Sequence, residues 1–356
     1  MTRRIGILTG GGDCPGLNAV IRAAVKTARG FGWEILGIRD GFEGLRNADT
    51  FRLSRDRIKG ILPVGGTILG STNKVDPFAV RVGGVVEDQS DRVLETFRHE
   101  ELDALITIGG DGTQAIAWKF FQRGIPVVAV PKTIDNDLWA TDITFGFDTA
   151  VETATLAIDK LHPTAESHQR VMVVEVMGRT AGWIALHSGI AGGADVVLIP
   201  EITFDLEHVC QAIEHRYAIG RKFAIVVVAE GAQVRADQAG LGNAYNHFTG
   251  SVVTDRIAEF IHERTGRDVR AMVLGHLQRG GSPTTFDRVL GSRLGAAAVR
   301  LIREEQYGRM VAVRGNALVP VDMAEVANRI RTVPPDGELV QTARDLGISF
   351  GDRPLL

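Results

Sequence analysis

The chain has little of what several classes of protein need. Its 356 residues include only two cysteines, Cys14 and Cys210, which are too few for a disulfide framework and lack the spacing of zinc ligands. Aromatic residues make up 6% of the chain, and no stretch approaches the ~20 consecutive apolar residues of a membrane span. These absences predict a soluble cytoplasmic protein with no membrane segment.

Charge of either sign is not in excess either. The 40 lysines and arginines face 43 aspartates and glutamates, and the formal net charge of −3 argues against a nucleic-acid binder. An anionic ligand would therefore have to be met by local positive groups. Glycine is the residue in excess, with 42 copies, and this number predicts many tight turns and close approaches of the backbone to a ligand.

Short apolar runs recur along the chain, each followed by a polar or glycine-rich turn. Eight of them predict buried parallel strands: IGILT, EILGI, ALITI, PVVAV, VMVVEV, DVVLI, AIVVVA and AMVLG. Helical apolar spacing at residues 18–28 and 148–161 predicts helices packed on a sheet, and a polar surface excursion is expected at residues 233–247 before a helix near Val253. The pattern predicts an α/β, doubly wound protein.

Ligands of open α/β sheets bind beyond the carboxyl ends of the strands, so the loops after these runs are the candidate sites. GGGDCPGLN, at residues 10–18, opens a helix whose N–H groups suit a phosphate. GGDGT, at residues 109–113, also enters a helix, and there Asp111 is placed to hold Mg²⁺ and Thr113 to donate a hydroxyl. A kinase needs a carboxylate beside the phosphates to carry magnesium, whereas a nicotinamide enzyme does not.

The loop PKTIDND, at residues 131–137, contains two carboxylates two positions apart, Asp135 and Asp137. In a turn they can point differently, so that one serves as general base on a substrate hydroxyl while the other faces a metal or the backbone. Such a separation of roles suits a site that deprotonates a substrate hydroxyl, and an Asx turn or a helix N-cap is the structural alternative for this cluster of Asp and Asn.

Three later strands are followed by MGRTAG, by Glu230 and by HLQRGGSP. Arg179, His276 and Arg279 are candidates for clamping a phosphate already present on the acceptor, and Glu230 is a candidate for bonding a sugar hydroxyl. Together these loops predict a site for a sugar phosphate.

Two arginines precede their strands instead of following them. Arg170 stands before VMVVEV and Arg270 at the head of RAMVLG, so each lies roughly 20 Å from the loop at the far end of its strand. If they touch an anionic ligand, it should be in the site of a neighbouring subunit, which predicts a symmetric oligomer with shared sites.

Taken in order, the motifs GGGDCPGLN, GGDGT, PKTIDND, SHQR, MGRTAGW, AGGADVVLIPE and RAMVLGHLQRGGSPTTFDR resemble the 6-phosphofructokinase family, from about residue 3 to near residue 302. The resemblance implies transfer of a phosphoryl group to the 1-hydroxyl of fructose 6-phosphate in glycolysis, with Mg²⁺ and with fructose 1,6-bisphosphate as product. The long segment between Glu230 and Arg270 resembles the branch of the family in which donor use is mixed.

The resemblance also implies an organisation in two domains, each with a doubly wound, mainly parallel sheet and helices on both faces. A donor domain for nucleotide and Mg²⁺ would comprise residues 1–146 plus about 278–328. A sugar-phosphate domain would comprise about 147–277 plus 329–356. A homodimer or homotetramer is expected, in which Arg170 and Arg270 reach a neighbouring subunit's site.

Individual roles follow by matching motif positions. Asp135 would be the base, assisted by Thr133, Lys132 and Arg179, and Asp111 would be the carboxylate associated with the metal. The donor would be bound by Gly11, Gly12, Asn73, Lys74, Gly110, Asp111, Gly112 and Thr113. The sugar phosphate would be bound by Thr133, Ile134, Asp135, Arg170, Met177, Gly178, Arg179, Glu230, Arg270, His276, Leu277, Gln278 and Arg279.

The family divides between ATP and pyrophosphate as donors, and two positions resemble opposite groups. Gly112 resembles the ATP users, which leave room there, whereas Lys132 resembles the pyrophosphate users. An expected arginine is absent from STNKVDPF, where Asn73 and Lys74 stand nearby. A side chain at position 112 would exclude ATP, whereas Lys132 only adds a cation and excludes neither donor. The absence of a side chain at Gly112 therefore decides the prediction: ATP is the expected donor, and pyrophosphate is the alternative.

Other classes of protein explain less of the sequence. A nicotinamide-dependent dehydrogenase built on the glycine turn, with Glu34 as its ribose-binding acid, leaves GGDGT and PKTIDND without a use. A non-catalytic sugar-phosphate sensor would not need Asp111, Asp135 and Asp137. An NAD or lipid kinase shares a GGDG-type loop but would not be expected to carry the downstream phosphate clamp.

Overall fold

A computed structural model describes residues 2–235, 252–327 and 329–354. The chain divides into two compact units, between which it passes several times. Unit 1 comprises Met1–Ile134, Leu138–Thr149 and Arg279–Ile330, and unit 2 comprises Asp135–Asp137, Ala150–Gln278 and Arg331–Leu356. No helix within the described ranges is long and apolar enough to cross a membrane.

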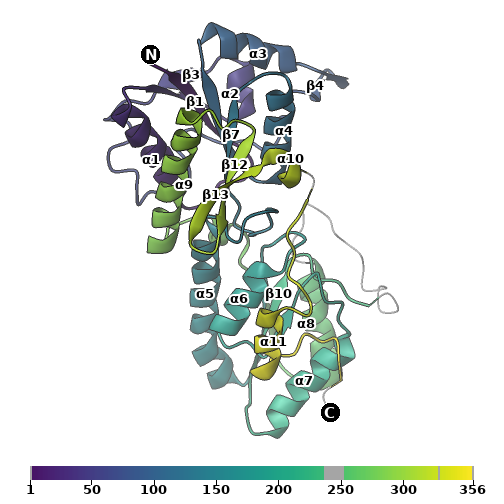
Figure 1. Cartoon of the computed structure of the whole chain (residues 1–356). Helices are drawn as coiled ribbons and strands as arrows, with labels where there is room; N and C mark the ends of the chain where they lie inside the picture. Colours follow the sequence, from purple (N-terminus) through teal and green to yellow (C-terminus); the bar gives the residue numbers. More distant parts are fainter. Residues whose placement is uncertain (1, 236–251, 328, 355–356) are drawn as a thin grey trace. The chain divides into compact units, whose positions relative to one another are not determined.

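Unit 1 is built on a seven-stranded sheet (Figure 1). From one edge to the other its strands are β13 (Ala317–Asp322), β12 (Arg309–Arg314), β7 (Val127–Pro131), β6 (Ala104–Gly109), β1 (Arg4–Thr9), β2 (Glu34–Ile38) and β3 (Thr50–Arg52). The five inner strands run parallel, and the two edge strands pair antiparallel to their neighbours. A separate hairpin pairs β4 (Val80–Val82) with β5 (Val85–Glu87).

Helices cover both faces of this sheet. One face carries α1 (Leu17–Gly30) and α9 (Thr285–Arg303), which lie side by side in Figure 1. They pack closely because Gly295 has no side chain where α9 meets the backbone of Val20. The other face buries its apolar residues against α2 (Phe42–Arg46), α3 (Ser90–His99), α4 (Asp111–Gln122) and α10 (Met323–Val326).

Unit 2 is built on a four-stranded, wholly parallel sheet. Its strands are, in order, β11 (Val269–Val273), β8 (Val171–Val176), β10 (Ala224–Ala229) and β9 (Val196–Leu198). The core on one face lies beneath α7 (Leu206–Ala218) and α8 (Val252–Thr265). The remaining elements are α5 (Phe147–His168), α6 (Trp183–Ala191), the short 3-10 helix η2 (Gly275–Arg279) and α11 (Glu338–Asp345).

The predicted α/β class and its parallel strands are confirmed. All eight apolar runs form strands, although β11 is partly exposed instead of buried, and the three predicted helices are α1, part of α5 and α8. The sequence did not predict the pair β12 and β13, whose outer member contains Pro320, a residue that an edge strand tolerates. The polar segment 233–247 falls from residue 236 onward outside the described residues.

Candidate functional site

The glycine turn after β1 is held close to other backbone in unit 1. The N–H of Gly11 donates to the Thr72 carbonyl at 3.0 Å, and Gly11 has a φ of +79°, which favours glycine. A Cβ at Gly12 would lie 2.6 Å from Nη1 of Arg279, which itself donates to the Asp13 carbonyl at 3.2 Å. Glycine at this position therefore allows the Arg279 guanidinium to reach the turn.

The second glycine loop leads from β6 into α4. A Cβ at Gly109 would lie 2.5 Å from Oγ1 of Thr113, whereas a Cβ at Gly112 would meet no atom within 4 Å. The buried Gln114 amide donates to the carbonyls of Gly109 and Val130, at 2.9 and 3.1 Å. The loop is thus fixed at its start and open at Gly112, beside a helix N-terminus that attracts anions.

Asp111 is the carboxylate that could hold a magnesium ion in this loop. It is the first residue of α4 and is half-buried. Across the residues that the structure describes, no group of three or more His, Cys, Asp or Glu side chains could hold a metal. Because Mg²⁺ is commonly bound through one or two carboxylates together with substrate phosphates, a single oxygen donor here fits that ion.

Lys132, which follows β7, links the two glycine loops of unit 1. Its buried ammonium donates to the Gly12 carbonyl, and its backbone N–H donates to the Gly109 carbonyl at 3.0 Å. The next residue, Thr133, accepts a 2.8 Å hydrogen bond at its carbonyl from Oγ1 of Thr144. The residues that follow β7 are therefore held by hydrogen bonds to both glycine loops and to Thr144.

In unit 2, a turn after β8 is held by side chains from other elements. Glu230 accepts hydrogen bonds at Oε1 from the N–H groups of Arg179 and Gly178, at 2.7 and 3.3 Å. The buried Gln278 accepts from the N–H of Met177 at 3.3 Å. Arg179 has a φ of +52°, so this turn keeps an unusual backbone conformation with the help of these acceptors.

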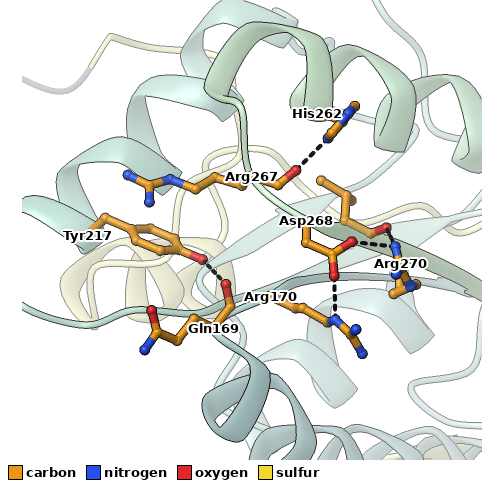
Figure 2. A network of polar contacts seen from close by, with 8 residues as sticks. Gln169, Arg170, Tyr217, His262, Arg267, Asp268 and Arg270 are labelled. Atoms are coloured by element: carbon orange, nitrogen blue, oxygen red, sulfur yellow. Dashed lines mark hydrogen bonds and ion pairs between the residues drawn. The ribbon is translucent and has the colours of Figure 1, made fainter.

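The two arginines predicted to precede their strands lie together at the amino ends of β8 and β11, where Arg170 precedes β8 and Arg270, against the prediction, is the second residue of β11. Figure 2 shows them on either side of Asp268, which accepts from Arg170 Nε at 2.5 Å and from Arg270 Nη1. The hydrogen bond from Arg170 is the main cause that lowers the pKa of the Asp268 carboxyl. Tyr217 steadies the neighbouring Gln169 by donating to its carbonyl at 3.0 Å.

The structure thus groups the predicted residues into three sets, of which the pair Arg170 and Arg270 in unit 2 is the smallest. The predicted residues of unit 1 are Gly11, Gly12, Asn73, Lys74, Gly110, Asp111, Gly112, Thr113, Lys132, Thr133, Ile134 and Arg279. Those of unit 2 that follow a strand are Asp135, Asp137, Met177, Gly178, Arg179, Glu230, His276, Leu277 and Gln278. Asn73, Lys74, His276 and Leu277 are exposed, whereas Asp135 and Asp137 are buried.

Sequence reasoning missed three side chains that support the unit 2 loops. Arg331 donates to the Asn136 carbonyl at 3.1 Å, Trp183 donates to the Arg331 carbonyl at 3.2 Å, and Glu201 accepts from the Gly182 N–H at 3.0 Å. Arg331 lies beyond the stretch that resembles the family and follows no apolar run. No signal in the sequence pointed to it.

Each unit also buries a carboxyl group near its loops. In unit 2, burial raises the pKa of Glu175 to about 7, and this carboxyl accepts a hydrogen bond from Thr254 Oγ1. In unit 1, burial raises the pKa of Asp287 to about 6, although Thr149 donates to it through both its N–H and its hydroxyl, at 2.9 and 2.6 Å. These groups are structural rather than placed in the loops themselves.

The glycine turn after β1 contains one of the two cysteines. The thiol of Cys14 is fully buried and donates weakly to the Phe145 carbonyl at 3.8 Å. Burial raises its pKa to about 12. A Cβ at Gly146 would lie 2.7 Å from this sulfur, so the thiol is closely packed.

Comparison with known proteins identifies the family. The family model described as phosphofructokinase matches residues 4–302. The ATP-dependent 6-phosphofructokinase of Chloroflexus aggregans is 52% identical over 357 residues, covering 98% of each chain. The pyrophosphate–fructose 6-phosphate 1-phosphotransferase of Streptomyces coelicolor is 49% identical, covering 98% of this chain and all of its own.

A solved structure agrees with the fold. The pyrophosphate-dependent phosphofructokinase of Marinobacter aquaeolei has a TM-score of 0.81 at 24% identity, covering 97% of this chain and 90% of its own. The family model and the full-length relatives provide the evidence of membership. On that evidence, this chain belongs to the phosphofructokinase family.

Proposed function

We propose that this chain transfers the terminal phosphoryl group of ATP to the 1-hydroxyl of fructose 6-phosphate, with Mg²⁺. Support comes from the full-length similarity to ATP-dependent 6-phosphofructokinases, at 52% identity for the Chloroflexus aggregans protein. The observation that carries the choice of donor is the open space at Gly112, where a Cβ would meet no atom within 4 Å. A nucleotide is larger than pyrophosphate and needs such room.

Pyrophosphate is the second candidate donor, because the Streptomyces coelicolor relative that bears that name is 49% identical. Lys132 is the residue that would favour it. Its ammonium already donates to the Gly12 carbonyl, so this lysine has a structural use that does not depend on the donor. An extra cation near the phosphates helps either donor, whereas a side chain at Gly112 would exclude the larger one.

In the proposed reaction Asp135 takes the proton of the 1-hydroxyl as that oxygen attacks the terminal phosphorus of ATP, and the bond from this phosphorus to the bridging oxygen breaks so that ADP leaves. A general base of this kind typically contributes about 10²–10⁴-fold. Lys132, Thr133 and Arg179 would stabilise the charge on the transferring group. Asp111 would hold Mg²⁺, whose charge offsets that of the donor phosphates when it is bound.

We assign donor binding to unit 1 and sugar-phosphate binding mainly to unit 2. In unit 1 the open glycine loops and the helix N-terminus at Asp111 supply backbone N–H groups for phosphates. In unit 2 the turn at Gly178 and Arg179, held by Glu230, supplies polar groups for the sugar phosphate. The proposed contacts to the sugar phosphate are completed by six further residues: Ile134, Met177, His276, Leu277, Gln278 and Arg279. Because ATP and sugar phosphates are metabolites of the cytoplasm, that is where we expect the chain to act.

We also propose that the enzyme is a homodimer or homotetramer in which Arg170 and Arg270 serve a neighbouring subunit's site. Their position at the amino ends of β8 and β11 supports this, because the loops of their own site follow the other ends of those strands. Mixing Asp135→Asn chains with Arg170→Ala chains should restore activity, since a hybrid site can draw each residue from a different parent. No recovery after verified subunit exchange would contradict shared sites.

The test of the donor is a coupled assay with fructose 6-phosphate and Mg²⁺, in which ATP and pyrophosphate are offered in separate runs. Faster turnover with ATP is expected at equal concentration. Faster turnover with pyrophosphate would show that Lys132 was the better guide than Gly112.

A further inference from the structure

Arg331 is a residue for which the proposed reaction has so far no use, and it binds the segment that contains the base. Its backbone N–H donates to the Asp137 carbonyl at 2.8 Å, and its Nη1 donates to the Asn136 carbonyl at 3.1 Å. One residue thus fixes two consecutive carbonyls directly after Asp135. All four residues belong to unit 2.

Arg331 is itself held in position by Trp183, the first residue of α6. Its guanidinium lies 4.0 Å from the centroid of the Trp183 ring, and its carbonyl accepts from the Trp183 indole N–H at 3.2 Å. Two residues further on, the N–H of Val333 donates to Glu201 at 2.8 Å, and the same carboxylate accepts from the N–H of Gly182 at 3.0 Å. The segment after Arg331 is therefore tied to the loop that contains Arg179.

The conformation of the base segment makes such support important. Asn136 has a φ of +53°, in the left-handed region that residues other than glycine rarely adopt, although asparagine tolerates it better than most. A rotation of this one dihedral would swing the preceding Asp135. Because reacting groups must be aligned closely, a displacement of about 1 Å caused by a remote change can cost about 10²-fold in rate.

We propose that Arg331 is a positioning residue for Asp135, holding the segment of the base against the loop of the acceptor site. This rests on the proposed function, in which Asp135 is the general base. Arg331 acts through the Asn136 and Asp137 carbonyls, and Trp183 and Glu201 keep its segment in place. A planar guanidinium suits this use because it can stack on an indole and donate a directed hydrogen bond at the same time.

The experiment compares Arg331→Gln with a matched control, Arg344→Gln. Arg344 belongs to the same unit, lies 4.8 Å from the ring centroid of Phe350 and pairs with Asp352, but it makes none of the contacts to the base segment described above. We expect Arg331→Gln to lower kcat about 10-fold while the KM for fructose 6-phosphate changes less than about 3-fold. Arg344→Gln should keep kcat within about 2-fold.

A double-mutant cycle with Asp135→Asn separates positioning of the base from general damage. If Arg331 acts through Asp135, Arg331→Gln should lower kcat less than about 2-fold in chains that already carry Asp135→Asn, because the base is gone. A loss as large as in the wild-type background would overturn the proposal. Arg331→Lys, which keeps the cation without the planar fork, should recover only part of the loss.

A milder variant covers the case in which Arg331→Gln does not fold. Trp183→Phe keeps an aromatic ring under the guanidinium but removes the N–H that bonds the Arg331 carbonyl, and should lower kcat about 3-fold with the same insensitivity in the Asp135→Asn background. Unchanged kcat in this variant and in Arg331→Lys would overturn the proposal. A wild type without activity on ATP and fructose 6-phosphate, or an active Asp135→Asn, would instead show that the proposed function or its base is wrong and would remove the positioning role with it.

Discussion

The loops of unit 1 and those of unit 2 follow strands in the same way but are shaped by opposite means. In unit 1 the loops depend on missing side chains, since a Cβ at Gly12 or Gly109 would collide with Arg279 or Thr113, and the side chains that hold them donate to their carbonyls. In unit 2 the turn at Gly178 and Arg179 is defined by side chains that accept its N–H groups, above all Glu230. We assign the glycine loops, which lead into helix N-termini, to the polyphosphate donor, and the turn held by Glu230 to the sugar phosphate.

The largest effect is expected for Asp135 in unit 2, because the proposed general base takes part in the reaction itself instead of holding a loop. Asp135→Asn should lower kcat roughly 10²–10⁴-fold while binding of fructose 6-phosphate changes far less, because only the proton acceptor is removed. Steady-state kinetics and substrate titration would measure the two effects separately. A variant with more than a third of the wild-type kcat would exclude Asp135 as the base.

The next prediction tests whether the space left by the missing side chain at Gly112 in unit 1 is needed to bind ATP. Gly112→Asp should lower kcat/KM for ATP at least about 10²-fold, or about 2.7 kcal/mol, by occupying that space and repelling the phosphates. Because a Cβ there meets no atom within 4 Å, thermal stability should barely change. Gly30→Asp, at another position where a Cβ meets nothing, is the matched control and should leave the kinetics intact. Equal losses in both variants would argue against a specific role for Gly112.

The same comparison predicts a loss of stability at the closed end of the second glycine loop. Gly109→Ala should lower the free energy of unfolding by about 1–3 kcal/mol, because its Cβ would press on Thr113. Gly112→Ala should stay within about 0.5 kcal/mol of the wild type. Urea denaturation of both variants would measure the difference. If Gly109→Ala were as stable as Gly112→Ala, the tight packing of this loop would be refuted.

In unit 2 the corresponding change is made at Glu230, whose carboxylate holds the turn at Gly178 and Arg179. Glu230→Gln weakens the two hydrogen bonds that hold Gly178 and Arg179, since a neutral amide is a poorer acceptor than a carboxylate. We expect the KM for fructose 6-phosphate to rise about 10-fold while the KM for ATP changes little. Glu207→Gln, which alters an exposed ion pair with Arg264, should change neither constant. A rise in the ATP constant instead would contradict the assignment of Glu230 to the acceptor.

The smallest effect concerns pH. Burial raises the pKa of Glu175 from its ordinary 4.5 to about 7 in the folded protein, so the folded state binds more protons than the unfolded state between these values. Stability is therefore greatest below the lower value and falls as pH rises, by about 1 kcal/mol between pH 6 and pH 8 from this group alone. Glu175→Gln, unfolded in urea at several pH values, should flatten the dependence. An unchanged slope would mean that Glu175 does not titrate in this range.

The sequence predicted the parts of the molecule that depend on local pattern. Eight apolar runs became strands, because a buried parallel strand must be apolar on both faces. The turns after these strands contain glycines and carboxylates, and these residue types indicate phosphate and metal binding from the sequence alone. The edge pair β12 and β13 was missed, since RMVAVR has only four apolar residues between two arginines and ALVPVD contains a proline.

Contacts between distant residues lay beyond this kind of reasoning. The hydrogen bond from Arg331 to the Asn136 carbonyl joins residues 195 positions apart, and its acceptor is a backbone atom that any residue would offer. The same holds for Glu201 and Val333, where one partner is a main-chain N–H. Such pairs leave no pattern in a single sequence, because only the fold decides which carbonyl lies opposite which side chain.

The packing of Cys14 has a consequence for chemical damage. Only a thiolate reacts readily with peroxides and alkylating reagents, and a thiol with a pKa of about 12 is almost wholly protonated at neutral pH. With its sulfur buried, this cysteine offers such reagents no route to the glycine turn that we assign to the donor. Oxidative stress should therefore leave phosphoryl transfer unimpaired at this loop, even though the turn contains the side chain that is usually the most easily oxidised.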